Sequence, residues 1–227
     1  MSLNINWKQS PNYTTGRNGK KIIAIVNHQT AGQCPGSLSW LCNAAAKASA
    51  HYLIYRDGTV YQLVKDSDTA WHAGAVNKPS WKLYDGSNPN HSTIGIEHEC
   101  YPAVGGDGNL TELQYQATLA LHRQLIKAHS IPIDRDHIIG HCQIDSVNRP
   151  NCPGSAFPWD RLMKDLKGEG TVPDKTPCKI VIKGIEFPGY LEGGSSHFAE
   201  GVKVTDVIKA LNNTITWDAK AVTANIK

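Results

Sequence analysis

The segment KIIAIVNH, residues Lys21 to His28, decides the fold class of this chain. It is a run of apolar, mostly β-branched residues that ends in a histidine, and such a run predicts a buried strand. TIGIEHE, Thr93–Glu99, and HIIGH, His137–His141, are predicted as further strands. HYLIYRDGTVYQLV, His51–Val64, is predicted as two strands joined by a turn, because Asp-Gly between apolar runs is a hairpin signal.

Helical patterns separate these strands. Ser37 is a candidate N-cap for a helix through Ala48. Thr111 and Gln114 form a capping box before the longest helix, which runs to Ser130. The apolar faces are predicted to hold Leu38, Leu41, Cys42 and Ala45 in the first helix and Leu113, Ala117, Leu121 and Leu125 in the second. A last short helix opens at Pro158 and runs through Lys167. Because strands and helices alternate, the chain is predicted to be an α/β protein.

Glycine and proline divide the chain into parts. Residues 66–91 are rich in Asn, Ser, Pro and Gly and are predicted as a long surface loop, where binding groups are often found. GEGTVPDKTP, residues 168–177, has two glycines, two prolines and no periodicity, which is typical of a linker. It follows a first domain at residues 1–167 and precedes a small C-terminal domain at residues 178–227. That domain is predicted to be α+β.

The composition excludes several classes of protein. The chain has 227 residues, 40% hydrophobic and 19% charged, with a formal net charge of +3. This apolar content is too high for a disordered chain of so small a charge, and no run approaches the ~20 apolar residues of a membrane helix. Lys and Arg are not clustered, so no nucleic-acid partner is expected. The N-terminal segment lacks the apolar core of a secretory signal, so the chain is expected to be made without a signal peptide.

Three residues carry the most informative chemistry. His28 and His141 each end a predicted strand, and Cys152 lies in the Asn-Cys-Pro-Gly segment that follows. Two imidazoles and one thiolate form a good ligand set for Zn²⁺, and three protein ligands leave a fourth position open for water. Strand ends hold such side chains rigidly at the edge of a sheet. From spacing alone, two partly buried histidines and an ordinary buried cysteine remain an alternative interpretation.

A family resemblance favours the metal site. VNHQT, SAHYLIYRDGTVYQLV, AWHAG, STIGIE, IIGH and CPG occur in this order. Together they resemble the zinc-dependent N-acetylmuramoyl-L-alanine amidases, a group that includes phage endolysins and the peptidoglycan recognition proteins. The match covers residues 22–166. The resemblance implies a central mixed β-sheet flanked by helices and a zinc site in a groove that binds peptidoglycan. It places the zinc ligands on His28, His141 and Cys152.

The resemblance also implies a mechanism. Zinc lowers the pKa of a bound water to about 7 and polarises the amide carbonyl. A carboxylate nearby takes the proton of the water and passes it to the leaving amine. Glu97 matches the carboxylate of the family's IGIE strand and is the candidate catalytic residue. Glu99 shares the same strand face by the period of two, so it is the alternative to test beside Glu97.

Three further residues are candidates for binding substrate. Trp71 and His72 lie in a segment that resembles the family's substrate-contacting WHAG motif. Where many members have a lysine two positions before the third ligand, this chain has Pro150. Arg149, its neighbour, or zinc alone would then stabilise the oxyanion. Other members carry a tyrosine at the position that Ala50 occupies in this chain. The neighbouring residue, His51, is expected to be structural. No role is assigned to His98, His122, His129 and His137.

The remaining cysteines leave two interpretations open. Cys34 and Cys42 lie eight positions apart, and a disulfide and two free buried thiols are both consistent with this spacing. Cys142 follows a candidate ligand directly, so its side chain is expected on the opposite face of the strand. A peptidase with Cys42 or Cys142 as the nucleophile is therefore a third hypothesis for function. It predicts inactivation by alkylation and no effect of chelators.

The C-terminal segment, from KIVIKG to AVTANI, resembles the copper amine oxidase N-terminal-like domain. The name does not imply copper here, because the segment holds only His197 and Cys178 as soft ligands. The resemblance implies a module for cell-wall binding or for formation of a homodimer. A spacer-like appendage that only stabilises the chain is the simpler interpretation.

The first hypothesis is thus a hydrolase that cleaves the amide between N-acetylmuramic acid and the L-alanine of the stem peptide. Its predicted partner is bacterial peptidoglycan, with neither nucleic acid nor membrane insertion involved. A phage or prophage endolysin is expected, made in the host cytoplasm and acting on the cell wall. The alternative is a peptidoglycan-binding protein without catalysis.

Overall fold

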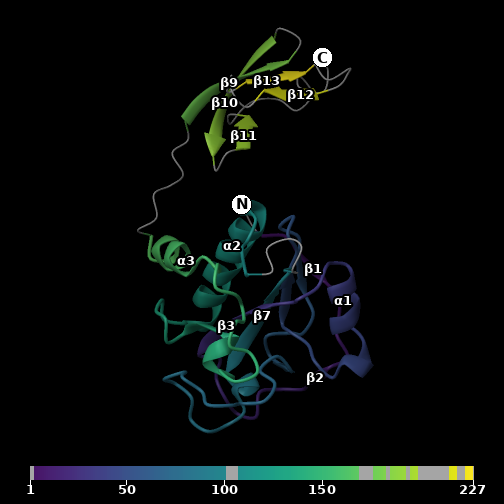
Figure 1. The fold of residues 1–227 in the computed structure, drawn as a ribbon, viewed down its shortest axis with the longest axis vertical. Coiled ribbons are helices and arrows are strands. Elements are labelled where there is room, and N and C mark those ends of the chain that lie inside the picture. Colours follow the sequence, from purple (N-terminus) through teal and green to yellow (C-terminus); the bar gives the residue numbers. More distant parts are fainter. Residues whose placement is uncertain are drawn as a thin grey trace. The chain divides into compact units, whose positions relative to one another are not determined.

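The computed structural model describes residues 3–100, 107–168, 176–182, 185–192, 195–198, 215–218 and 223–226. The chain divides into two compact units, Met1–Gly170 and Thr171–Lys227. Figure 1 shows the strands and helices of both units along the sequence. Within the described part of the chain, no helix combines the length and the apolar character that a membrane crossing requires.

The first unit is built on a six-stranded sheet with the order β1-β5-β4-β7-β3-β8. The strands are β1 (Ile5–Trp7), β3 (Ala24–Gln29), β4 (Tyr52–Ile54), β5 (Val60–Gln62), β7 (Thr93–His98) and β8 (Ile138–Gly140). β4 and β5 pair antiparallel, as the Asp-Gly turn predicts, whereas the other neighbours are parallel. The predicted central mixed sheet with helices is confirmed.

Two helices pack against this sheet. α2 (Glu112–His129) covers one face, where Ala117, Leu121 and Leu125 join the cluster of Ile25 and Ile94. Full burial of each leucine or isoleucine side chain in this cluster stabilises the fold by roughly 1.5–3 kcal/mol. α3 (Trp159–Leu166), which lies where the last short helix was predicted, packs beside α2 through a second apolar cluster. The parallel strands β3 and β7 are consequently buried along nearly their whole length.

The start of α2 corrects two predictions. Leu113 was expected on the buried face, but it is 63% exposed. Each step of four residues advances the helix by about 40°, so Leu113 lies about 80° from Leu121. The capping box is also only half formed. Thr111 caps the helix by accepting from the Gln114 N–H at 3.1 Å, but the Gln114 side chain donates to the carbonyls of Ile54 and Glu99 instead.

The helix predicted over residues 37–48 is wrong. α1 spans only Gly36–Leu41, and a 3₁₀ turn, η1 (Ala44–Ala46), follows it. Asn43 separates the two in an extended conformation, and its side chain accepts from the Ala45 N–H. Asparagine competes with the helical hydrogen bonds in this way because its oxygen can cap a new turn. The nearby thiols of Cys34 and Cys42 are not joined by a disulfide.

The predicted surface loop at residues 66–91 is more ordered than expected. β6 (Thr69–Ala70) pairs with β2 (Tyr13–Thr14), and η2 (Pro89–His91) leads into β7. Trp81 is 5% exposed and packs on the sheet face opposite α2. Its indole N–H donates to the Asp136 carbonyl at 2.8 Å. Buried tryptophan anchors the segment, a role that its polar composition hides.

The second unit is described only in part. It contains β9 (Thr176–Ile182), β10 (Ile185–Glu192), β11 (Ser195–Phe198), β12 (Ile215–Asp218) and β13 (Thr223–Ile226). Their order is β11-β10-β9-β13-β12, and only β13 and β9 pair in parallel among these neighbours. β9 includes the last two residues of the predicted linker, 176 and 177. The pattern of VTDVIKALNN predicts a helix at residues 204–213, which lie outside the described residues. The copper amine oxidase-like domain stays a prediction.

Candidate metal centre and its cleft

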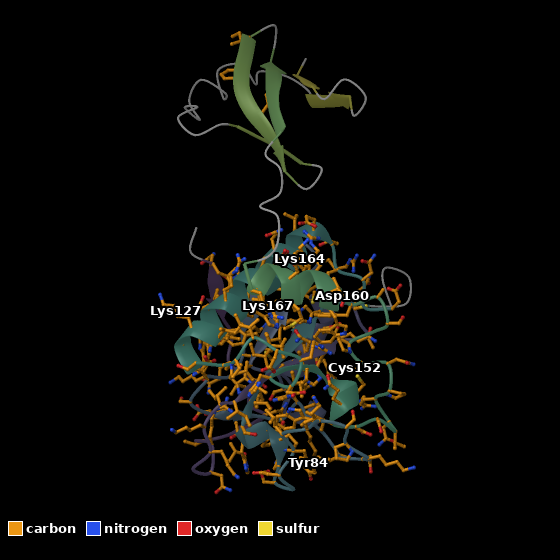
Figure 2. All side chains as sticks on the ribbon, turned by 90° about the vertical axis from the view of Figure 1, so that its left-hand side faces the viewer. Tyr84, Lys127, Cys152, Asp160, Lys164 and Lys167 are labelled. Carbon is orange, nitrogen blue, oxygen red and sulfur yellow. The ribbon has the colours of Figure 1, made fainter. Side chains whose placement is uncertain are left out.

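The structure brings the three predicted metal ligands together. One ligand atom from each of His28, His141 and Cys152 lies within 4.8 Å of the other two. His28 is near the end of β3, and His141 follows β8 as the first residue of a 3₁₀ turn, η3 (His141–Gln143). Cys152, labelled in Figure 2, comes from the loop after that turn. All three side chains are buried, with exposed fractions of 1%, 6% and 8%.

Two backbone hydrogen bonds hold Cys152 next to the edge of the sheet. The Cys142 N–H donates to the Cys152 carbonyl at 3.0 Å, and the Cys152 N–H donates to the Arg149 carbonyl at 3.1 Å. Gly140 allows this approach, because a Cβ at its position would lie 2.8 Å from the Pro153 side chain. The glycine of the IIGH segment is therefore a packing requirement of the loop that carries the third ligand.

The imidazoles of the site have one hydrogen too few. His28 contacts His141 through the two Nδ1 atoms at 3.0 Å, and it contacts His72 Nδ1 through Nε2 at 3.1 Å. His72 Nε2 lies 3.1 Å from the Thr93 hydroxyl, and His141 Nε2 lies 2.9 Å from the Ala73 carbonyl. Three neutral rings supply three N–H groups for these four contacts, and the Thr93 hydroxyl adds none because it donates to the Pro89 carbonyl at 2.8 Å.

A cation would complete this arrangement. Burial holds the pKa of His28 well below its usual value, lowers the pKa of His72 to about 3 and also lowers the pKa of His141, so the three rings are neutral. One contact is then left as two facing nitrogen lone pairs. A metal ion held by His28 and His141 would resolve this. Together with the sulfur of Cys152, the donor set fits Zn²⁺.

Glu97 lies beside this group with an unsatisfied carboxylate. It pairs with His28 across β3 and β7. Its Oε2 is buried and has no hydrogen-bond partner among the described residues. Burial raises the pKa of Glu97 to about 8, and the positive charge of Arg149 opposes this shift. A carboxyl group that titrates near neutral pH can accept a proton and return it.

Glu99, the alternative to Glu97, has a structural environment. One of its oxygens accepts from the Cys34 N–H and the other from the Arg56 N–H, both at 2.8 Å. Its side chain does not line the cleft. Both oxygens thus fasten two loops to the end of β7 and are not available to a substrate.

The side chain of Asn90 fixes the backbone of the WHAG segment. The Asn90 side chain accepts from the His72 and Ala73 N–H groups at 3.1 and 2.8 Å. His72 is only 7% exposed and packs over Gly95, where a Cβ would lie 2.4 Å from its ring. Trp71 is 36% exposed on the cleft. The glycine of the IGIE segment therefore makes room for His72.

His51, expected to be structural, lies behind the same strand. It is fully buried, and its Nδ1 accepts from the Gly95 N–H at 3.0 Å. This contact keeps its ring on the strand backbone and away from the cleft, which it does not line.

The three candidate ligands line a cleft of about 1610 Å³. Its walls come from α1, the WHAG segment and the loop between β8 and Cys152. Arg149 is exposed on the last of these walls. Trp40 is 56% exposed on the first wall and was missed by the sequence analysis. The available signal was its position outside the apolar face that Leu38 and Leu41 form.

The geometry disfavours a cysteine nucleophile. Burial raises the pKa of the thiols of Cys42 and Cys142, which makes the reactive thiolate scarce at neutral pH. Neither side chain lines the cleft. The third hypothesis, a Cys–His peptidase, has no support from the described residues.

Comparison with known proteins agrees with this geometry. The family model described as N-acetylmuramoyl-L-alanine amidase matches residues 18–155. N-acetylmuramoyl-L-alanine amidase A of Achromobacter lyticus is 30% identical over 180 residues, which are 72% of this chain and 93% of that protein. The 1,6-anhydro-N-acetylmuramyl-L-alanine amidase AmpD of Salmonella typhimurium is 39% identical over 120 residues, 52% of this chain and 57% of that protein.

A solved structure extends the likeness to the fold. The amidase AmiD from E. coli, in complex with anhydro-N-acetylmuramic acid-L-Ala-D-gamma-Glu-L-Lys, is 27% identical with a TM-score of 0.54. The match covers 74% of this chain and 63% of that chain. The family model spans all the residues that line the cleft near the candidate ligands, from His28 to Cys152. The chain belongs to the N-acetylmuramoyl-L-alanine amidase family.

Proposed function

We propose that this chain is a zinc-dependent amidase that hydrolyses the bond between N-acetylmuramic acid and the L-alanine of the stem peptide. One observation carries the proposal: two imidazoles and a thiol converge within 4.8 Å beside a buried carboxylate oxygen for which the described part of the chain offers no hydrogen-bond partner. The printed names of the relatives and the substrate in the AmiD complex supply the bond and the polymer. Peptidoglycan is thus the proposed partner.

The residues would share the work of hydrolysis. Zinc held by His28, His141 and Cys152 would activate a water molecule and polarise the scissile carbonyl. Glu97 takes a proton as the water oxygen bonds to the carbonyl carbon. Glu97 returns that proton to the leaving nitrogen of L-alanine as the C–N bond breaks, so no further reactant is needed. Burial of the carboxylate suits it for both steps, because it holds the pKa of Glu97 near neutral.

The cleft would position the substrate around these groups. Arg149 offers a guanidinium on the cleft wall, where it can face the developing oxyanion. The indole N–H of Trp71 donates to the Thr14 hydroxyl at 3.0 Å, which fixes the ring while leaving part of it exposed. An aromatic face of this kind stacks well on sugar or peptide.

One rival to this proposal remains. A non-catalytic peptidoglycan-binding protein does not need a complete ligand set, so the presence of all three ligands and Glu97 favours the enzyme. The role as a phage or prophage endolysin is a finer proposal about where the enzyme acts. Cell-wall binding or dimer formation is the corresponding proposal for the C-terminal unit.

The test uses the full chain on purified cell walls. We expect one equivalent of zinc per chain, release of new L-alanine amino termini, and loss of this activity on chelation with recovery on zinc addition. Mass spectrometry of the products identifies the bond that is cut. Cys152→Ser should lose zinc and activity, whereas Cys142→Ser, the matched control outside the cluster, should keep both. Full activity in the presence of chelator would contradict the zinc assignment.

A further inference from the structure

We propose that Thr93 is a positioning residue that acts through His72 to set which nitrogen of His28 carries hydrogen. The inference rests on the proposed function, because it concerns the nitrogen that His28 offers to a metal ion. Thr93 is fully buried at the start of β7 and does not line the cleft. Its influence on the site must therefore pass through other side chains.

The chain of hydrogen bonds begins at a backbone carbonyl. The Thr93 hydroxyl oxygen lies 2.8 Å from the Pro89 carbonyl oxygen. Two oxygens repel at this distance unless a hydrogen lies between them, and a carbonyl has none to give. The Thr93 hydroxyl is thus the donor. Its oxygen is then free to accept from a second neighbour.

His72 is that neighbour. Its Nε2 lies 3.1 Å from the Thr93 hydroxyl oxygen, so Nε2 carries the hydrogen and donates it. A neutral imidazole has a single N–H. His72 Nδ1 is consequently an acceptor, and it faces His28 Nε2 at 3.1 Å.

His28 completes the sequence. Because His72 Nδ1 can only accept, the contact is a hydrogen bond only when His28 Nε2 carries the hydrogen. His28 Nδ1 then offers its lone pair toward His141 and Cys152, the side where the ligand atoms converge. Removing the Thr93 hydroxyl removes this preference, since His72 could then donate from Nδ1 and leave the hydrogen of His28 on the nitrogen meant for the metal.

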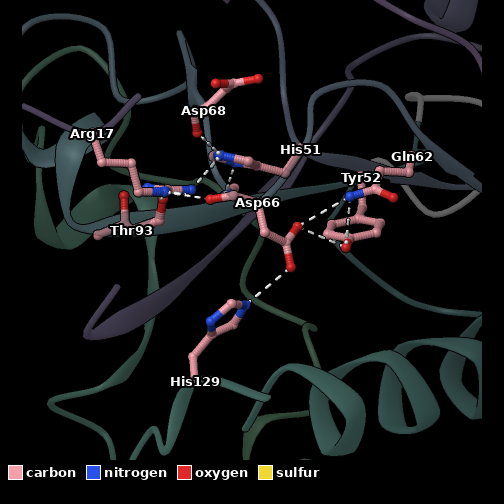
Figure 3. A network of polar contacts seen from close by, with 9 residues as sticks. Arg17, His51, Tyr52, Gln62, Asp66, Asp68, Thr93 and His129 are labelled. Carbon is pink, nitrogen blue, oxygen red and sulfur yellow. Dashed lines mark hydrogen bonds and ion pairs between the residues drawn. The ribbon is translucent and has the colours of Figure 1, made fainter. Parts of the chain in front are cut away.

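The backbone around Thr93 is itself fixed. The buried guanidinium of Arg17 donates through Nη1 to the carbonyls of Asn90, His91 and Thr93, at 3.2, 3.2 and 3.0 Å. Figure 3 shows Arg17 pointing at Thr93. The backbone from Asn90 to Thr93 is therefore held in place. Such outer hydrogen bonds typically change metal affinity by 10–100-fold when they are removed.

The experiment compares Thr93→Val, which keeps the shape, with Thr93→Ser, which keeps the hydroxyl. Zinc affinity of the metal-free full chain is measured by competition with a chromophoric chelator. We expect about 10-fold or more weaker binding in Thr93→Val and affinity close to wild type in Thr93→Ser. Equal affinity in wild type and Thr93→Val would overturn the inference. Failure of the wild type to bind zinc would instead overturn the proposed function.

A second measurement needs no variant. Long-range ¹H–¹⁵N spectra of the zinc-loaded wild type report which imidazole nitrogens carry hydrogen. We expect the hydrogen of His72 on Nε2 and that of His28 on Nε2. A hydrogen on Nδ1 of His72 would contradict the proposed chain even if the valine variant did not fold. If Thr93 only filled space, it would not favour these hydrogen positions over the alternative ones.

Discussion

Two polar regions of the first unit, one partly and one largely buried, differ in how their hydrogen bonds are completed. One is the Arg17 network of Figure 3, made of Arg17, His51, Tyr52, Gln62, Asp66, Asp68, Thr93 and His129. The other is the site cluster, made of His28, Glu97, His141 and Cys152. In the network, Asp66 accepts from the Tyr52 hydroxyl and the Gln62 amide through one oxygen and contacts His129 through the other. In the cluster, Glu97 has an oxygen without a partner among the described residues.

This difference distinguishes residues that stabilise the fold from residues that are candidates for binding a ligand. A completed buried network stabilises one conformation, whereas unpaired buried groups cost free energy that only a ligand recovers. A lone unpaired atom is not enough, because Asn27, Gln114 and His122 each have one as well. Convergence of several such groups on one cleft is what identifies the site.

The largest expected effect is at Glu97, the carboxylate of the site cluster. Glu97→Gln should lower kcat by about 10²–10⁴-fold, because it removes proton transfer while leaving the zinc ligands in place. Zinc content measured beside the rate of L-alanine release checks this. Glu99→Gln, the matched control, should lower the melting temperature and keep kcat close to wild type. A large loss of kcat in the control alone would exchange the two roles.

The next effect concerns stability of the network. Arg17→Met should lower the free energy of unfolding by about 3 kcal/mol or more, because several buried carbonyls lose their donor. Urea denaturation of the metal-free chain measures the change. Lys20→Met removes only the exposed ion pair with Asp85 and should cost less than about 1 kcal/mol. Equal costs for the two variants would show that the network does not stabilise the fold.

A third prediction concerns His122 and the pH dependence of the free energy of unfolding. Burial lowers the pKa of His122 to about 4, while an unfolded histidine titrates near 6.5. The unfolded state therefore binds the extra proton between these values, and stability falls as the pH drops from 6.5 to 4. The loss amounts to about 3 kcal/mol by linkage. His122→Leu should flatten this part of the curve in urea titrations of metal-free protein, and an unchanged slope would contradict the assignment.

The smallest effect concerns the cleft wall. Trp40→Ala should raise KM by about 3- to 10-fold with little change in kcat, because an exposed indole contributes stacking energy to binding only. Trp7 is 49% exposed on β1 and does not line the cleft, so Trp7→Ala is the control. Steady-state kinetics on soluble muropeptides separates the two constants. A similar KM in both variants would remove Trp40 from the binding surface.

Sequence reasoning predicted the sheet and the three side chains that the structure brings together as candidate ligands. β3, β7 and β8 follow from continuous apolar runs, and His28 and His141 lie where those runs end. The order of the family segments added Cys152, which spacing alone left open. These features are predictable because they depend on local patterns and on strand direction.

The support beneath the ligands was not predictable. Thr93 and Asn90 act through side-chain contacts to residues about twenty positions away, and such contacts leave no periodicity in the sequence. Helix details failed for a related reason. Gln114 has the local pattern of a capping box, but buried carbonyls of other strands compete for its amide. Tertiary hydrogen bonds decided these cases.

The parallel pairing of β3 with β7 sets a strict tolerance on insertions and deletions. His28 stands opposite Glu97 only in the observed register, and neighbouring side chains along a strand point to opposite faces. Losing one residue between Thr93 and Ile96 would turn the carboxylate toward the far side of the sheet without altering any metal ligand. Length changes in this strand should therefore be far rarer among functional descendants than substitutions, and a frame-preserving deletion library would reveal this as a gap in the surviving sequences.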